Sequence, residues 1–405
     1  MEPSPIRQSI CLPFESEAHY TNCVENIKVY RSYIEKFSAH HPELFPEAIS
    51  DGFVFHDSYT SVKQEVTLRR IKLKADHSVW TLRPSFLLPY LVARTDEVEK
   101  ALYLRHWGVP FEALAYVFGR SEMFWYRAWL QMGRPALVGT TVKSPARLPR
   151  HLVADEKQSW IQGEKCYVPT VAGGGCLLGA SVVDTASTTE LIAGYGEFAR
   201  ECQEVAREYL PETVCTDGWK ATREAWRLLY PTLTLILCFL HSILKIKDRC
   251  RGALRAQVLD RAWRVYEAQT RRQFSQRVRR FDEWAERELT GAVVELIAKM
   301  RQCGEKFLTA YSHPEAHRTS NGVDRLMNHQ ARVLYAMRYF HASKESARLA
   351  VRAIALHWNF HPYGKRLRRA DRRRVSPFHD LNGFEYHPNW LHNLLIASSM
   401  GGARC

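Results

Sequence analysis

The chain has 405 residues, of which 46% are hydrophobic and 25% are charged. This balance excludes a mainly disordered protein, and the length predicts two or three domains. An excess of 57 Lys and Arg over 43 Asp and Glu leaves a net charge of +14 at pH 7. The charge favours a polyanionic partner such as nucleic acid, although an anionic lipid surface or solubility alone would also account for it.

The ten cysteines are scattered, and none forms a Cys-x-x-Cys pair. This spacing argues against a disulfide framework and against an all-cysteine zinc ribbon, and it fits a reducing cytosol. The first residues lack the basic and apolar pattern of a signal peptide, and no apolar run approaches the roughly 20 residues that span a bilayer. We therefore expect a cytoplasmic protein with no membrane partner.

Residues 1–92 form the first predicted region. Apolar and basic residues alternate between 66 and 91, which predicts strands. This stretch is similar to the strand pair of a small ribbon-type DNA-binding module that lacks its metal cysteines.

Residues 93–135 predict a helix-turn-helix. Thr95 is a plausible N-cap for a helix that ends at Gly108, a second helix follows over 111–118, and Gly119 makes the turn before a third helix. The third helix would enter the major groove. The alternative is an ordinary three-helix core, because Trp125, Tyr126 and Trp129 look like core residues.

A linker is predicted over 136–149, and the following residues have an α/β pattern. Helices are expected at 188–209 and 218–230, and residues 242–314 are expected to be all helical. Short apolar runs predict five strands, at 150–155, 165–170, 176–183, 212–217 and 233–238.

Asp155 and Asp217 each end one of these predicted strands. Acids at the carboxyl ends of neighbouring strands meet at one edge of a sheet. Two close carboxylates repel each other unless a cation lies between them, so the pair predicts Mg²⁺ or Mn²⁺. The alternative for either residue alone is a cap, a role that suits Asp217 before Gly218.

Four segments of residues 150–362 resemble the successive blocks of bacterial insertion-sequence DDE transposases, closest to the Mutator-like superfamily. The segments are Ala154-Asp155-Glu156, Thr216-Asp217-Gly218, Cys238-Phe239-Leu240-His241, and Thr319-Ser320-Asn321 with the nearby Asp324.

This resemblance implies a ribonuclease-H-like mixed five-stranded sheet at 150–241 and 315–362, interrupted by an all-helical insertion at 242–314. It implies that Asp155, Asp217 and Asp324 are the catalytic acids and hold two Mg²⁺ or Mn²⁺ ions. The family's third acid is usually Glu, so Asp324 is one methylene shorter, and Glu315 is the fallback. Cys238, His241 and Asn321 would support the site. Cys238 and His241 could instead be half of a zinc site, but no second Cys/His pair lies nearby in sequence.

Two basic clusters predict phosphate contacts, with a solvated helix face as the alternative. One begins the insertion, and the other lies in the basic C-terminal tail at 363–405, which composition predicts to be poorly ordered before an aromatic patch around Phe384, Tyr386 and Trp390. The expected DNA-binding residues are Lys245, Lys247, Arg249, Arg251, Arg325, Lys365, Arg366, Arg368 and Arg369.

The implied function is metal-dependent cleavage at transposon ends and strand transfer into target DNA. The implied partners are the terminal repeats, the target DNA and further copies of the chain, in a bacterial, nucleoid-associated setting. The alternatives are a domesticated, non-catalytic DNA-binding protein of the same fold and a stand-alone ribonuclease-H-like nuclease. A serine or tyrosine recombinase is disfavoured because it would use a covalent protein–DNA adduct rather than metal-binding acids.

Overall fold

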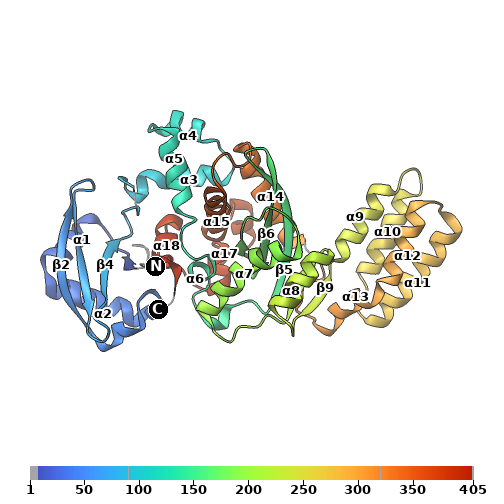
Figure 1. The fold of residues 1–405 in the computed structure, drawn as a ribbon, viewed down its shortest axis with the longest axis horizontal. Helices are drawn as coiled ribbons and strands as arrows, with labels where there is room; N and C mark the ends of the chain where they lie inside the picture. The colour runs from blue at the N-terminus through green and yellow to red at the C-terminus, as the bar shows by residue number, and fades with distance from the viewer. Residues whose placement is uncertain (1–7, 90, 320, 404–405) are drawn as a thin grey trace.

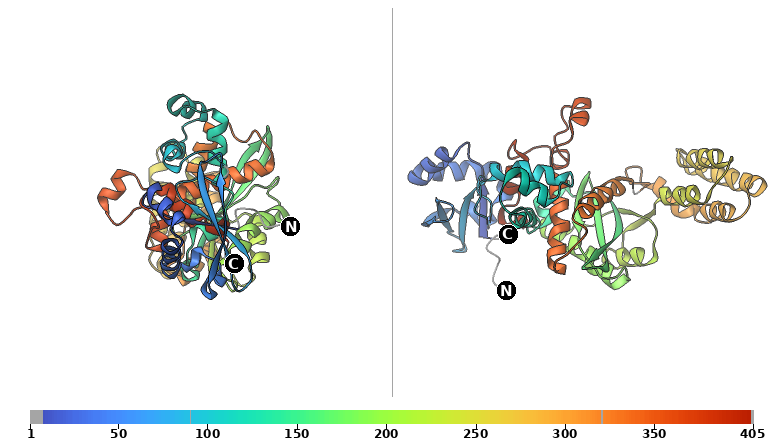
Figure 2. Two further views of the ribbon diagram at one scale, coloured as in Figure 1. Left: turned by 90° about the vertical axis from the view of Figure 1, so that its left-hand side faces the viewer. Right: turned by 90° about the horizontal axis from the view of Figure 1, so that it is seen from above.

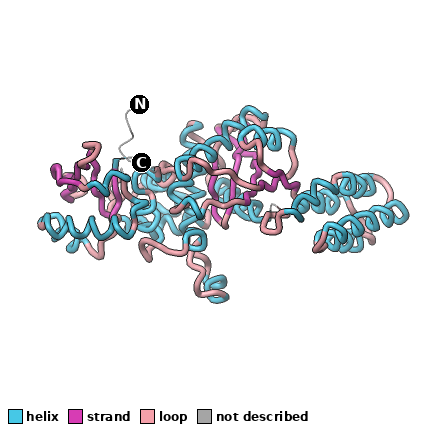
Figure 3. Tube along the Cα trace, turned by 90° about the horizontal axis from the view of Figure 1, so that it is seen from below, coloured by secondary structure: helices cyan, strands magenta, loops and turns pink. Residues whose placement is uncertain are grey.

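A computed structural model describes residues 8–89, 91–319 and 321–403, without the side chains of 321–324. The protein is a mixed α/β structure, as predicted, with two sheets. An N-terminal sheet, a central group of helices, a second sheet and a separate helical body follow one another along the long axis (Figure 1). Helices separate the two sheets (Figure 3). No helix in the described part of the chain is both long enough and apolar enough to cross a membrane.

The N-terminal sheet has the strand order β1-β4-β3-β2. The stretch 66–91 contains two antiparallel strands, as predicted, and its alternating burial explains why the pattern was visible. The parallel pairing of β1 with β4 was not predicted, because it joins segments about 70 residues apart. The elements are β1 (Ser9–Leu12), α1 (Glu17–Glu25), α2 (Ile27–His40), β2 (Phe53–Ser61), β3 (Val66–Leu73) and β4 (Val79–Pro84).

Three helices follow at the predicted positions, α3 (Thr95–His106), α4 (Phe111–Phe118) and α5 (Glu122–Gln131). Gly119 turns the chain with φ +69°. The predicted N-cap is wrong by one residue, because Arg94 is the N-cap and the buried Thr95 hydroxyl donates to the Ser85 carbonyl. Trp125 and Trp129 are buried, and α5 packs against α15 (Lys344–Phe360). One face of α5 is therefore part of the core.

The second sheet has the order β7-β6-β5-β8-β9. β5, β6 and β7 are antiparallel neighbours, whereas β8 and β9 run parallel to β5. The segment predicted as a linker contains α6 (Leu137–Thr141), whose five residues are all buried. The elements are β5 (His151–Ile161), β6 (Glu164–Gly173), β7 (Cys176–Ala180), α7 (Thr188–Val205), β8 (Thr213–Thr216), α8 (Lys220–Leu229) and β9 (Thr234–Leu237).

A helical body follows β9 and has its own apolar core, which includes Phe239, Phe274 and Phe307. It forms one end of the molecule (Figure 1). Its helices are α9 (Phe239–Arg249), α10 (Arg255–Tyr266), α11 (Arg271–Glu288), α12 (Ala292–Gln302) and α13 (Gly304–Leu308). The chain then returns to the sheet through α14 (Asn321–Ala336), which packs on β5 and β6.

Helix α15 runs beside the edge strand β7 and closes that edge. The Asn359 amide donates to the carbonyl of Leu177, and its carbonyl accepts the Leu177 N–H, both at 2.8 Å. Since an open strand edge invites pairing with other chains, these two bonds protect the sheet.

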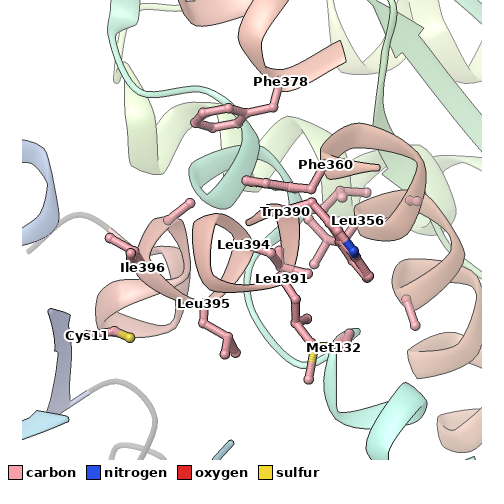
Figure 4. Packing of buried hydrophobic residues seen from close by; sticks show 14 of the residues in the cluster. Cys11, Met132, Leu356, Phe360, Phe378, Trp390, Leu391, Leu394, Leu395 and Ile396 are labelled. Carbon is pink, nitrogen blue, oxygen red and sulfur yellow. The ribbon is translucent and has the colours of Figure 1, made fainter. Parts of the chain in front are cut away.

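The predicted disorder of the C-terminal tail is wrong in part. The basic stretch forms α16 (Lys365–Ala370), which projects from the side of the molecule (Figure 2). After it come α17 (Pro377–Asn382) and the buried α18 (Trp390–Ala397). Leu391, Leu394 and Leu395 of α18 lie with Leu356 and Phe360 of α15 in the central core (Figure 4). The tail is therefore more ordered than its basic composition predicts, because α18 anchors it in the core.

A buried ion-pair network ties α15 to α7. The Arg352 guanidinium pairs with Glu197 and, at 2.7 Å, with Glu201, and it also donates to the carbonyls of Gly133 and Pro135. Removing one partner of such a network leaves an uncompensated buried charge.

We expect Arg352→Ala to lower the free energy of unfolding by about 3–5 kcal/mol in denaturant titrations. Arg264→Ala, which removes an exposed pair with Asp260 on one helix, is the control and should change stability little. Equal effects of the two substitutions would contradict the buried network's role.

Four buried histidines, His106, His329, His357 and His361, form a cluster between α3, α14 and α15. The rings of His106 and His361 stack with centroids 3.6 Å apart. Burial lowers the pKa of His329 and His357 to about 3 and of His361 to about 4, and it lowers that of His106 as well. The nearby cations Arg105, Arg332 and Arg368 act in the same direction.

Because the unfolded histidines take up protons near pH 6.5 and the folded ones stay neutral to about pH 4, stability should fall as the pH drops below 6.5. Each such histidine contributes up to about 1.4 kcal/mol per pH unit. In urea titrations between pH 7 and 5, His357→Leu should therefore show a shallower loss of stability than the unmodified protein. An unchanged slope would show that this cluster does not govern the acid response.

Candidate active site

Side-chain alternation divides the residues of β5 between the two faces of the second sheet. Leu152 and Ala154 pack with the residues of α7 and α8, whereas Val153 lies in the other core cluster, together with Leu326 and Met327 of α14. Asp155 has the same parity as Val153 and therefore faces the α14 side. Glu156 faces α7 and α8.

The neighbouring strands follow the same rule. Cys215 of β8 and Cys238 after β9 belong to the core on the α14 side, and Asp217 has the parity of Cys215. The parallel pairing of β5 with β8 ends at Val153 opposite Cys215, so Asp155 and Asp217 both lie two residues beyond the last pair. The structure thus brings the two predicted acids to one edge and one face.

The prediction that Asp155 ends its strand is wrong, because β5 continues to Ile161 in an antiparallel ladder with β6. What ends near Asp155 is the pairing with β8. Asp155 still lies at the predicted edge of the sheet, because the short parallel strands β8 and β9 end at that level while β5 continues past it.

Asp217 shapes the turn between β8 and α8. Its Oδ1 accepts the N–H of Trp219 at 2.8 Å, so Asp217 caps the turn after β8, whereas the N-cap of α8 is Trp219 and not Asp217. The intervening Gly218 has φ +87°, and a Cβ there would lie 2.3 Å from Leu237 Cδ1. Glycine is therefore required where the carboxylate leaves the sheet.

His241 lies beside both acids at the first turn of α9. A hydrogen bond with Cys238, together with the negative charges of Asp155 and Asp217, raises the pKa of His241 to about 9 against the opposing effect of burial. The imidazole is consequently protonated at neutral pH and offsets part of the repulsion between the acids. The Cys-x-x-His segment thus joins the two acids in one charged cluster.

Two of the predicted residues, Asn321 and Asp324, have side chains outside the described residues. Their backbone lies in α14, which crosses the same face as the acids. The Thr170 hydroxyl, opposite Asp155 in the β5–β6 register, lies 3.5 Å from the Gln330 side-chain oxygen. Asp324 precedes Gln330 by six residues, about 9 Å of helix. Among the side chains that the structure does describe, no three His, Cys, Asp or Glu groups are placed to share one metal ion.

The fallback acid, Glu315, lies elsewhere. Its exposed carboxylate is 3.9 Å from His151, at the start of β5. His151 is four residues from Asp155, about 13 Å along a strand. Glu315 is therefore not gathered with Asp155 and Asp217.

The predicted DNA-binding residues occupy three separate places. Lys245 lines a cavity beside Asp217, whereas Lys247, Arg249 and Arg251 are exposed around the end of α9. Arg325 is exposed on α14. The remaining four, which are Lys365, Arg366, Arg368 and Arg369, are exposed on the projecting helix α16 (Figures 2 and 3).

The cavity beside Asp217 has a volume of about 460 Å³. It lies between α8 and β9 on one side and the helices α9, α12 and α13 on the other, and His241 and Lys245 also line it. Sequence reasoning missed four further cations on its wall, Arg223, Arg227, Lys299 and Lys306. Arg223 and Arg227 lie four residues apart on α8, the helix that follows Asp217, so the sequence alone could have indicated that they share one helix face near the acid. The two lysines come from a distant segment and could not.

Glu156 was also missed as a positioning residue. Its Oε1 accepts the Tyr195 hydroxyl of α7 at 2.6 Å and the Thr222 hydroxyl of α8 at 2.7 Å. Burial raises the pKa of Glu156 to about 7, while the two hydrogen bonds oppose that rise. The side chain thus fastens α8, which follows Asp217, to the back of β5.

We expect Glu156→Ala to lower the unfolding free energy by about 1–3 kcal/mol, because the buried Tyr195 and Thr222 hydroxyls lose their acceptor. Glu156→Gln keeps an acceptor oxygen and should recover much of that loss. Chemical denaturation checks both variants, and an alanine variant as stable as the glutamine variant would contradict the positioning role.

No protein-family model and no curated protein sequence matches this chain.

Proposed function

We propose that the chain is a DDE-type DNA transposase, which cuts the ends of a mobile element and joins them to target DNA. The observation that carries the proposal is the convergence of Asp155 and Asp217 on the face that α14 covers, with His241 close enough to feel the charge of both. The resemblance of four sequence blocks to such enzymes supports the same conclusion.

The arrangement of the second sheet supports a ribonuclease-H-like fold. Three antiparallel strands are followed by two strands parallel to the first, with helices between them, and the order β7-β6-β5-β8-β9 places β5 at the centre. The helical body enters directly after β9, where the resemblance predicts an insertion.

Asp155 and Asp217 are hard oxygen donors on adjacent strands, which fits Mg²⁺ or Mn²⁺, and Asp324 would complete the set. Two such ions would supply an activated water or 3′-hydroxyl and would stabilise the leaving oxygen. The chain's own part is to hold the carboxylates at one edge, with His241 beside them. Glu156 keeps α8, and with it the Asp217 turn, in place.

DNA would be held by the exposed cations on α9, α14 and α16. The helix-turn-helix proposal applies to the exposed side of α5, where Glu122, Met123 and Arg127 face solvent, because its other side is buried against α15. Pairing of two element ends favours a homo-oligomer. The prediction of an oligomer rests on the resemblance.

The test is a plasmid assay in which the DNA flanking the gene is incubated with the full-length protein and Mg²⁺. We expect strand cleavage and joining that EDTA abolishes, and Asp155→Asn or Asp217→Asn should lower the rate at least about 100-fold. Asp260→Asn, an exposed acid of the helical body, is the matched control and should retain the rate.

Cleavage that survives in either variant would remove the residue from the mechanism. Site-specific binding without cleavage in the unmodified protein would identify a non-catalytic DNA-binding protein, and cleavage without joined products would identify a nuclease.

A further inference from the structure

The cavity beside Asp217 is lined by cations from two parts of the chain that are far apart in sequence. Arg223 and Arg227 come from α8, Lys299 from α12 and Lys306 from α13. Cations spaced along one helix are often a solvated face, but convergence from separate elements on one hollow indicates an anion site.

Among the side chains that the structure describes, no acid forms an ion pair with these cations. Arg223, Arg227, Lys245, Lys299 and Lys306 form no salt bridge with any described side chain, and Asp217 is the one acid among the described residues that line the cavity. Other cations close by are paired, since Lys220 contacts Glu224 and Arg301 contacts Asp282. The unpaired set therefore favours an anionic ligand.

The cavity also has an apolar wall. Leu235 and Leu237 of β9 lie on one side of it, and Leu296 and Met300 of α12 lie on the other. A purely ionic surface would not need this wall. A volume of about 460 Å³ is in the range of small-molecule sites, roughly 300–1,000 Å³, and a ligand with both phosphate and a flat apolar face fits such a lining.

We propose that this cavity binds one unstacked nucleotide of a single DNA strand, with its phosphates on the cations and its base against the leucines. Nucleic-acid strands are held in this combined way, by a basic groove with apolar or aromatic platforms for bases. The choice of DNA as the ligand rests on the proposed function. The nucleotide would lie next to Asp217, so the helical body would help to position the strand at the acids.

The test uses the full-length protein in EDTA with a short single-stranded DNA that carries one 2-aminopurine, whose fluorescence rises when the base leaves its stack. The pocket variant is Lys299→Gln with Lys306→Gln, two exposed positions. Its charge-matched control is Lys28→Gln with Lys36→Gln on α2, far from the cavity. Equal thermal midpoints would show that both variants are folded.

We expect the pocket variant to weaken binding at least about tenfold and to lower the salt slope of binding by about 1.4, the value for two lost phosphate contacts on a single strand. The control should stay within about twofold of the unmodified protein. Leu296→Ser should reduce the fluorescence rise while leaving the salt slope unchanged, because it removes apolar contact with the base and no charge.

Equal affinity of the pocket variant and the control would overturn the inference, and so would tighter binding of a duplex of equal length with no fluorescence rise. Because the measurement involves no metal and no cleavage, it is independent of the plasmid assay. If the pocket variant loses strand binding but the unmodified protein cuts no DNA, the nucleotide site is supported and the transposase proposal is refuted. If the unmodified protein cuts DNA but the pocket variant binds the strand normally, the transposase proposal is supported and the nucleotide site is refuted.

Discussion

The in-register parallel pairing of β5 with β8 is the constraint on which the site depends. The pairing between β5 and β8 ends at Val153 opposite Cys215. Asp155 and Asp217 each follow that last pair by two residues, so both side chains lie on the same face of the sheet. A shift of one residue in either strand would turn its acid into the core on the other side. The apolar residues before each acid prevent that shift, because Val153 and Cys215 are buried on the α14 side and Leu152 and Val214 on the opposite side.

Bringing two carboxylates together costs electrostatic energy, and the surrounding structure offsets this cost. His241 supplies a positive charge and is held by Cys238 at the end of β9. On the back of the sheet, Glu156 fastens α7 and α8 to β5. The alternation of Asp155 and Glu156 thus places one carboxylate on the α14 face and the other among the helices that support the opposite face.

The connection from β9 into α9 places the helical body beside the acids. Cys238 ends the strand region and Phe239 begins the body's own core, so the two parts are joined without a linker. The cations of α12 and α13 therefore face α8 across one cavity. In the centre of the molecule, α18 contacts both β1 of the N-terminal sheet and α15, so segments near the chain's two ends share one core (Figure 4).

The sequence by itself determined most of the local structure. Apolar periodicity predicted the helices α3, α4, α5, α7 and α8 and the five strands of the second sheet, because these patterns repeat within a few residues. The two acids were also visible, as each follows an apolar run. Only the tertiary structure decided the rest, because it depends on pairing between distant segments. The continuation of β5 beyond Asp155 depends on its pairing with β6. The C-terminal helix α18 is folded because its apolar residues pack against α15 and Cys11. The cavity that joins Asp217 to Lys299 and Lys306 arises where a separately folded body meets the sheet, and no local pattern encodes that contact.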